Sequence, residues 1–105
     1  MAIQEVDTDR LAELLTQGVR VIDVREPAEF EQARLDGSTL IPLGTVPENV
    51  EAFRGDVPTY VICRSVCRSM QACKFLDVQG VEVVNVTGGL MAWISSSRDY
   101  VSGPA

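Results

Sequence analysis

Cys63 is the residue best suited to chemistry, because basic and hydroxyl side chains follow it directly. The segment 63–69 reads Cys-Arg-Ser-Val-Cys-Arg-Ser, in a chain whose formal net charge is -6. Guanidinium and hydroxyl groups donate hydrogen bonds to anions, and positive charge beside a thiol favours the nucleophilic thiolate. The segment therefore predicts a thiolate that attacks a small oxyanion while the loop holds the negative charge.

The absence of histidine excludes most other chemistry for this thiol. Without histidine, the chain has neither a Cys-His dyad nor a Ser-His-Asp triad, and three cysteines alone make a poor tetrahedral zinc site. Cys63, Cys67 and Cys73 are an odd number within eleven residues, which suits reactive or buried thiols better than a disulfide framework. We expect neither a metal nor an organic cofactor.

Composition and charge limit the possible partners and locations. Nine Lys and Arg residues against fifteen Asp and Glu residues disfavour nucleic acid and membrane surfaces as partners. No apolar run approaches the roughly 20 residues that span a bilayer, and the first residues lack the pattern of a signal peptide. We therefore expect one cytoplasmic domain over residues 1–105.

Short apolar segments alternate with helical patterns along the chain. Strands are expected at residues 3–6, 19–24, 39–41, 59–63 and 81–86. Helices are expected from Asp7 or Thr8 to Gly18, from Pro27 to about Arg34, at 49–54, from about Arg68 to Gln79, and from Gly88 and Gly89 through Trp93, with an irregular tail over about 95–105. The alternation predicts an α/β fold, with a mostly parallel central sheet of about five strands flanked by helices.

This sheet would place the chemical residues at one edge. Segment 59–63 has the strongest β propensity, so we expect it at the centre of the sheet. Ligands bind at the C-terminal ends of parallel strands, which directs attention to the loops after Val24 and Ile62. Cys63 would then lie between a buried strand and a helix N-terminus, where free backbone N–H groups and the helix dipole stabilise a thiolate.

Asp23, Arg25 and Glu26 follow the second strand and should reach the same edge as Cys63. We expect them chiefly to hold the loop structurally, through an ion pair, rather than to contact substrate. Of the three, Arg25 is the one expected to face substrate. On the helices, Cys73 is expected to be a small core residue, and Phe75 is expected to belong to a core stripe.

Three stretches of the chain resemble the signature motifs of single-domain rhodaneses in their order and spacing. They are residues 21–30 (Val-Ile-Asp-Val-Arg-Glu-Pro-Ala-Glu-Phe), 63–69, and 85–93 (Asn-Val-Thr-Gly-Gly-Leu-Met-Ala-Trp). The resemblance implies a rhodanese-like fold in which Cys63 takes sulfur from a small sulfur-containing anion such as thiosulfate, or from a persulfide. Cys63 would then pass the outer sulfur to cyanide or to a thiol, which can be a small molecule or a thioredoxin-like protein. It also implies a cradle that binds this sulfur, made by Arg64, Ser65, Val66, Cys67, Arg68 and Ser69.

The length of the loop separates two activities on this scaffold. Four residues lie between Cys63 and Arg68, as in rhodaneses, whereas the phosphatases that share the scaffold have five and therefore a wider cradle. Val66 departs from the family pattern because it stands where glycine is common. A β-branched residue at that position predicts either a different loop path or stored strain, with reduced activity.

Two alternatives to sulfur transfer follow from the same loop. Cys67 could resolve a persulfide on Cys63 by forming a Cys63–Cys67 disulfide with release of sulfide, which would make the chain a thiol redox switch. The departure at Val66 instead suggests a catalytically weak module used for binding or regulation. Both remain open at the level of sequence.

Overall fold

The computed structural model describes residues 3–65 and 67–104 and contains a five-stranded sheet. The strands are β1 (Gln4–Val6), β2 (Arg20–Asp23), β3 (Thr39–Leu40), β4 (Thr59–Ile62) and β5 (Val83–Val86). Their order is β1-β5-β4-β2-β3, and every paired neighbour is parallel. The expected sheet and the central place of β4 are therefore confirmed.

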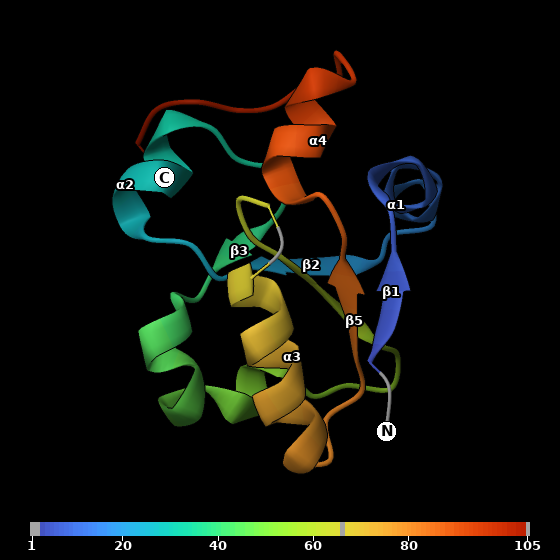
Figure 1. Cartoon of the computed structure of the whole chain (residues 1–105), viewed down its shortest axis with the longest axis vertical. Coiled ribbons are helices and arrows are strands. Elements are labelled where there is room, and N and C mark those ends of the chain that lie inside the picture. Colours follow the sequence, from blue (N-terminus) through green and yellow to red (C-terminus); the bar gives the residue numbers. More distant parts are fainter. Residues whose placement is uncertain (1–2, 66, 105) are drawn as a thin grey trace.

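Helices cover both faces of this sheet (Figure 1). They are α1 (Thr8–Leu15), α2 (Pro27–Gln32), α3 (Cys67–Val78) and α4 (Gly89–Ser95), together with 3-10 helices at Leu43–Glu48 and Val50–Phe53. Figure 1 shows α1, α2 and α4 in the upper half of the molecule and α3 with the 3-10 helices in the lower half. Across residues 3–65 and 67–104, no helix combines the length and apolar character needed to cross a membrane.

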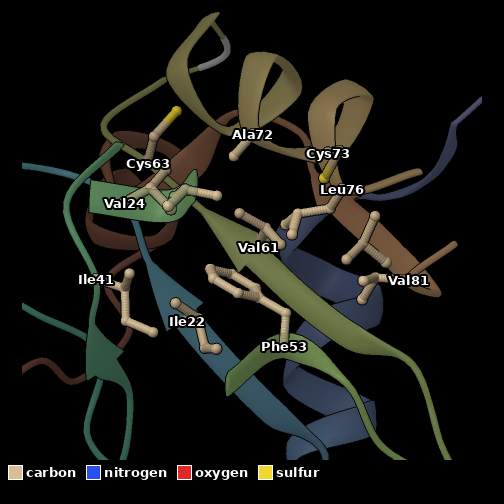
Figure 2. Packing of buried hydrophobic residues seen from close by; sticks show 12 residues of the cluster. Ile22, Val24, Ile41, Phe53, Val61, Cys63, Ala72, Cys73, Leu76 and Val81 are labelled. Carbon is tan, nitrogen blue, oxygen red and sulfur yellow. The ribbon is translucent and has the colours of Figure 1, made fainter. Parts of the chain in front are cut away.

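Alternation along the inner strands divides the core into two layers. On β4, Val61 packs in the layer beneath α3, whereas Ile62 packs with the residues of α1 and α4. Figure 2 shows the first layer, in which Phe53 of a 3-10 helix packs in one cluster with Val61 of β4 and Leu76 of α3. Because both faces of β4 are covered, none of its side chains is exposed, and the hydroxyl group of Thr59 is buried and donates to the carbonyl oxygen of Phe53. The end of this strand therefore holds the backbone of Cys63 in a fixed position.

The helix boundaries follow from local capping. The side chain of Asp7 accepts a hydrogen bond of 2.8 Å from the Arg10 backbone N–H and begins α1. Gly18 follows the end of this helix with a φ of +82°, a backbone conformation that glycine adopts without steric penalty. Pro27 occupies the first turn of α2, where its missing N–H leaves no partner unsatisfied.

Three details differ from the sequence predictions. The expected helix at 49–54 is a 3-10 helix over Val50–Phe53, and the preceding 3-10 helix at Leu43–Glu48 was not predicted. Phe75 is wrongly predicted as core, because its side chain is 36% exposed. Beyond α4, residues 96–104 form no helix or strand, and Val101 pairs with Arg34 in an isolated antiparallel bridge. This pairing follows from contacts between distant segments, which local sequence patterns do not encode.

Candidate active site

Cys63 lies at the C-terminal end of the central strand and is 1% exposed. Figure 2 shows its sulfur directed toward the segment that leads into α3. The Sγ atom lies 3.2 Å from the Oγ atom of Ser69, which is fully buried in the first turn of α3. The sulfur therefore faces a hydroxyl group and the N-terminal end of a twelve-residue helix. The N-terminus of α3 directs the positive end of a helix dipole toward this part of the loop.

The remaining residues of the predicted cradle fall into two groups. Arg64, Ser65 and Cys67 are exposed, whereas Arg68 is partly buried. Val66 lies outside the described residues, so its expected strain and its predicted role rest on the sequence alone. The described part of the loop therefore presents one buried hydroxyl group to the sulfur and one exposed guanidinium group to solvent.

The first turn of α4 holds the backbone on which Cys63 sits. The backbone N–H of Leu90 donates to the carbonyl oxygen of Cys63 at 2.9 Å, and that of Met91 donates to the carbonyl oxygen of Arg64 at 3.0 Å. Gly89 makes this approach possible: its φ is +58°, and a Cβ atom there would lie 2.5 Å from the Cys63 carbonyl oxygen. Only glycine satisfies both constraints.

We expect Gly89→Ala to lower the free energy of unfolding by at least about 3 kcal/mol, because the methyl group meets backbone atoms that cannot rotate away. Gly37→Ala is the matched control, since Gly37 has a φ of +82° but no atom within 4 Å of the added Cβ. It should cost only about 1 kcal/mol. Urea denaturation measures both variants, and equal losses would refute the claim that close approach to Cys63 requires Gly89.

A buried ion pair lies beside the Cys63 loop, at the end of β2. The Nη2 atom of Arg25 lies 2.7 Å from Oδ2 of Asp23, whose side chain is fully buried, and the Arg25 backbone N–H donates to Oδ1 at 2.9 Å. Arg25 also donates from Nη2 to the carbonyl oxygen of Ala33 at 2.7 Å, which ties the end of β2 to α2. Glu26 is exposed and precedes α2, and its backbone N–H donates to the Glu29 carboxylate at 3.0 Å. Arg25 and Asp23 therefore fix the position of α2.

A second ion pair joins α2 to the loop. Arg68 donates to both carboxylate oxygens of Glu29, at 2.6 and 2.8 Å. This hydrogen bond is the main reason why the pKa of Glu29 is lowered from 4.5 to about 2. Glu29 in turn raises the pKa of Arg68. The sequence analysis did not single out Glu29, although it lies within the stretch 21–30. Its partner is 39 residues away, so no local spacing signals the pair.

The stability provided by Glu29 should depend on pH in the acid range. Because folding lowers the pKa of Glu29 from 4.5 to about 2, this contribution is fully present above about pH 4.5 and is lost as the pH falls toward 2. In Arg68→Met, we expect the pKa of Glu29 to move back toward 4.5. NMR titration of the Glu29 carboxyl carbon measures this change. An unchanged pKa in the variant would show that Arg68 does not cause the shift.

With this geometry established, the sequence can be compared with known families. Residues 7–96 match the family described as "Rhodanese-like domain". The chain belongs to this family. The rhodanese-like fold expected from the three sequence motifs is thereby confirmed.

Named relatives and a solved structure agree with this assignment. The domain is 41% identical over 100 residues to "Putative sulfurtransferase YtwF" of Bacillus subtilis, covering 93% of this chain and 97% of the relative. It is 29% identical over 104 residues to "Thiosulfate sulfurtransferase GlpE" of Pseudomonas aeruginosa, covering 97% and 94% of the two chains. The crystal structure of a rhodanese-related protein from Thermoplasma volcanium superposes with a TM-score of 0.87 at 31% identity, covering 93% and 97%.

The three thiols of this rhodanese-like domain differ in their environments, and none is in a disulfide. Cys73 is fully buried, as expected, and burial is the main cause that raises its pKa to about 12. Its thiol therefore stays protonated at neutral pH and is unreactive. Cys67 is exposed at the start of α3. Within residues 3–65 and 67–104, no three metal-ligating side chains lie close enough to hold a metal ion.

A pocket of about 140 Å³ opens between α2 and α4, next to the Cys63 loop. Arg25 and Glu29 line it from the side of α2, Arg64 lines it from the loop, and Met91 lines it from α4. The residue that follows Cys63 in the loop is therefore part of the pocket wall, together with residues of both flanking helices.

Proposed function

We propose that this rhodanese-like domain is a sulfurtransferase that carries sulfane sulfur as a persulfide on Cys63. The donor is thiosulfate or a persulfide, and the acceptor is cyanide or a thiol. One observation carries the proposal: the buried Cys63 sulfur ends the central strand and faces the Ser69 hydroxyl group at the N-terminus of α3. The relatives named as sulfurtransferases support the same reaction class.

Loading begins with attack of the Cys63 thiolate on the outer sulfur of thiosulfate. A sulfur–sulfur bond forms on Cys63 while the sulfur–sulfur bond of thiosulfate breaks, and sulfite leaves with the electron pair. In this proposal the Ser69 hydroxyl group donates a hydrogen bond to the reacting sulfur. The positive end of α3 and the exposed Arg64 compensate for the incoming anion.

In the discharge step, a second nucleophile removes the outer sulfur from Cys63. Cyanide or a thiolate attacks the outer sulfur of the Cys63 persulfide, and the Cys63 thiolate leaves with the electron pair of the broken bond. The products are thiocyanate or a new persulfide, and the domain returns to its starting state without an external oxidant or reductant. A thioredoxin-like protein is a further candidate acceptor. Three free cysteines fit a reducing compartment, and we place the activity in the cytoplasm.

The supporting residues are assigned to two kinds of role. In this proposal five residues border the transferred sulfur, namely Arg64, Ser65, Val66, Cys67 and Ser69. Arg68 and Arg25 lie behind them, and carboxylates compensate their charges. Asp23 and Glu26 act on the structure of the adjoining loop. The compensation means that Arg68 positions the loop through Glu29 more than it attracts substrate.

A thiol redox switch is the second candidate, favoured by the exposed free thiol of Cys67 at the start of α3. Here the Cys67 thiolate attacks the inner sulfur of the persulfide, forming the Cys63–Cys67 disulfide and releasing sulfide. Thiocyanate formation from thiosulfate and cyanide distinguishes the two. Sustained thiocyanate formation without added reductant supports transfer. Release of one equivalent of sulfide with little thiocyanate, followed by an arrest that dithiothreitol reverses, supports the switch, and Cys67→Ala should abolish that arrest.

A further inference from the structure

We propose that the C-terminal tail, residues 97–104, holds α2 in place and thereby positions the loop that follows Cys63. Arg34 joins the tail to α2, and Arg68 joins α2 to the loop. The inference rests on the proposed function and adds positioning residues to that same site. Its observations are the hydrogen bonds that the tail donates to the end of α2, a separate attachment at the other end of the tail, and the ion pair between α2 and the loop.

Helix α2 lacks the usual means of ending a helix. It has six residues, of which only Phe30 is buried, and helices this short are not stable without tertiary contacts. Its last turn holds no basic side chain, and its C-cap residue Ala33 has an extended backbone rather than the left-handed one that commonly closes a helix. The last carbonyl oxygens of a helix have no partner within it, so those of α2 need donors from elsewhere.

The tail supplies donors to this end of α2. The backbone N–H of Gly103 donates to the carbonyl oxygen of Glu31, and the Ser102 hydroxyl group donates to that of Gln32, both at 2.8 Å. Arg25 donates to the next carbonyl oxygen along the chain at 2.7 Å. Three successive carbonyl oxygens at the end of α2 are therefore satisfied, two of them by the tail.

Arg34 joins the tail to α2 through both its backbone and its side chain. Its backbone N–H and its carbonyl oxygen pair with the backbone of Val101, at 2.8 Å each. Its Nη1 atom donates to the carbonyl oxygen of Gly103 in the tail at 2.7 Å and to that of Phe30 in α2 at 3.2 Å. The Cζ atom also lies 5.1 Å from the centroid of the Phe30 ring. One half-buried side chain thus bridges the tail and the helix.

The other end of the tail is attached independently of α2. The Nε1 atom of Trp93 in α4 donates to the carbonyl oxygen of Asp99 at 2.8 Å. The guanidinium group of Arg98 lies over the Trp93 ring, and its Nη2 atom lies 2.7 Å from a carboxylate oxygen of Asp9 in α1. Figure 1 shows the tail running from the end of α4 to α2. Because the tail is attached at both ends, it can resist movement of α2.

One carboxylate connects α2 to the reactive loop. Glu29 accepts hydrogen bonds from both terminal nitrogens of Arg68, at 2.6 and 2.8 Å. Arg68 is the second residue of α3 and follows Cys63 by five positions. When the end of α2 frays, the Glu29 carboxylate loses its fixed position and the loop loses this attachment. The tail therefore acts on the orientation of the reacting groups although it does not touch them.

Three variants test this connection, and none of them alters the reactive loop. The first is Arg34→Ala, and the second is a chain that ends at Asp99 and so lacks the part of the tail that meets α2. Arg54→Ala is the matched control. Arg54 also binds a carboxylate, that of Glu51, and a backbone carbonyl oxygen, that of Gln79, but it lies outside α2 and the tail.

The first measurement does not depend on activity. NMR titration of the Glu29 carboxyl carbon should give a pKa of about 2 in the wild type and an unchanged value in Arg54→Ala. In Arg34→Ala and in the shortened chain, the pKa should rise toward the ordinary 4.5, because the ion pair with Arg68 is weakened.

The second measurement is kcat for thiocyanate formation, taken where circular dichroism shows every variant to be folded. We expect kcat to fall about fivefold in Arg34→Ala and in the shortened chain, and to change by less than about twofold in Arg54→Ala. A tail that only stabilised the fold would leave kcat of the folded protein unchanged.

The outcomes separate the tail from the proposed function. An unchanged pKa of Glu29 or an unchanged kcat in either variant, or an equal fall in Arg54→Ala, overturns the positioning role and leaves the sulfurtransferase intact. A wild type that forms no thiocyanate overturns the proposed function instead, and the pKa of Glu29 still decides whether the tail holds α2. Should the shortened chain not fold, Arg34→Ala keeps every residue of the tail and gives the same comparison.

Discussion

Replacing the sulfur of Cys63 with oxygen, in Cys63→Ser, should lower thiocyanate formation from thiosulfate and cyanide at least about a thousandfold. A serine hydroxyl at this position stays protonated and is a much weaker nucleophile than a thiolate, and it cannot form the persulfide that carries the sulfur. The substitution keeps the size of a side chain that is 1% exposed, so the fold should survive. Rates and circular dichroism measured on the same samples separate lost chemistry from lost structure.

Cys73→Ala is the matched control for this experiment. Cys73 is also a fully buried thiol packed in the same core layer, but its pKa of about 12 keeps it protonated. We expect this variant to lose some stability and to retain most of its activity, because the residue does no chemistry. Equal loss of activity in both variants would mean that packing of the core, rather than the nucleophile at Cys63, explains the result.

The largest expected loss of stability comes from Asp23→Asn. The carboxylate is fully buried and receives hydrogen bonds from Nε, Nη2 and the backbone N–H of Arg25, which is itself only 4% exposed. The amide would leave the guanidinium charge buried without a counter-charge, at a cost of about 3–5 kcal/mol. For a domain of this size, that cost should lower the thermal midpoint by at least about 12 °C.

Two further variants show whether charge is the cause. Glu51→Gln breaks the exposed pair with Arg54, where the Glu51 side chain is 84% exposed, and should cost less than about 1 kcal/mol. The double variant Asp23→Leu with Arg25→Met removes both buried charges and should recover much of the stability lost in Asp23→Asn. Calorimetry measures all three, and an Asp23→Asn protein as stable as Glu51→Gln would contradict the role assigned to the buried pair.

The sequence predicted the main sheet because its signals are local. The centre of β2, Val21 and Ile22, and most of β4 are short apolar segments, and their side chains on both faces of the sheet are buried or half-buried. The position of Cys63 followed from the same pattern, since a strand that ends before a helix places its next residue at the edge where ligands bind. The N-terminal signals of α1 and α2 also lie within a few residues of each helix, and both helices begin where predicted.

The interactions around the site could not be predicted in this way. The Glu29–Arg68 pair spans 39 residues, and the approach of Gly89 to the Cys63 carbonyl oxygen joins two separate motifs. The 3-10 helix over Leu43–Glu48 contains Pro47 and Gly44, which interrupt any helical periodicity. Phe75 has the expected apolar character, but the direction of α3 turns it partly toward solvent. These features depend on how the elements pack, which single-chain patterns do not record.

The most direct test of the persulfide on Cys63 is the intact mass of the wild-type protein after incubation with thiosulfate. We predict a gain of one sulfur, about 32 Da, that a reductant removes and that Cys63→Ser does not show. An unchanged mass with thiosulfate and with an organic persulfide donor would contradict sulfur transfer through Cys63. A loss of about 2 Da would instead indicate the Cys63–Cys67 disulfide, and with it the redox switch.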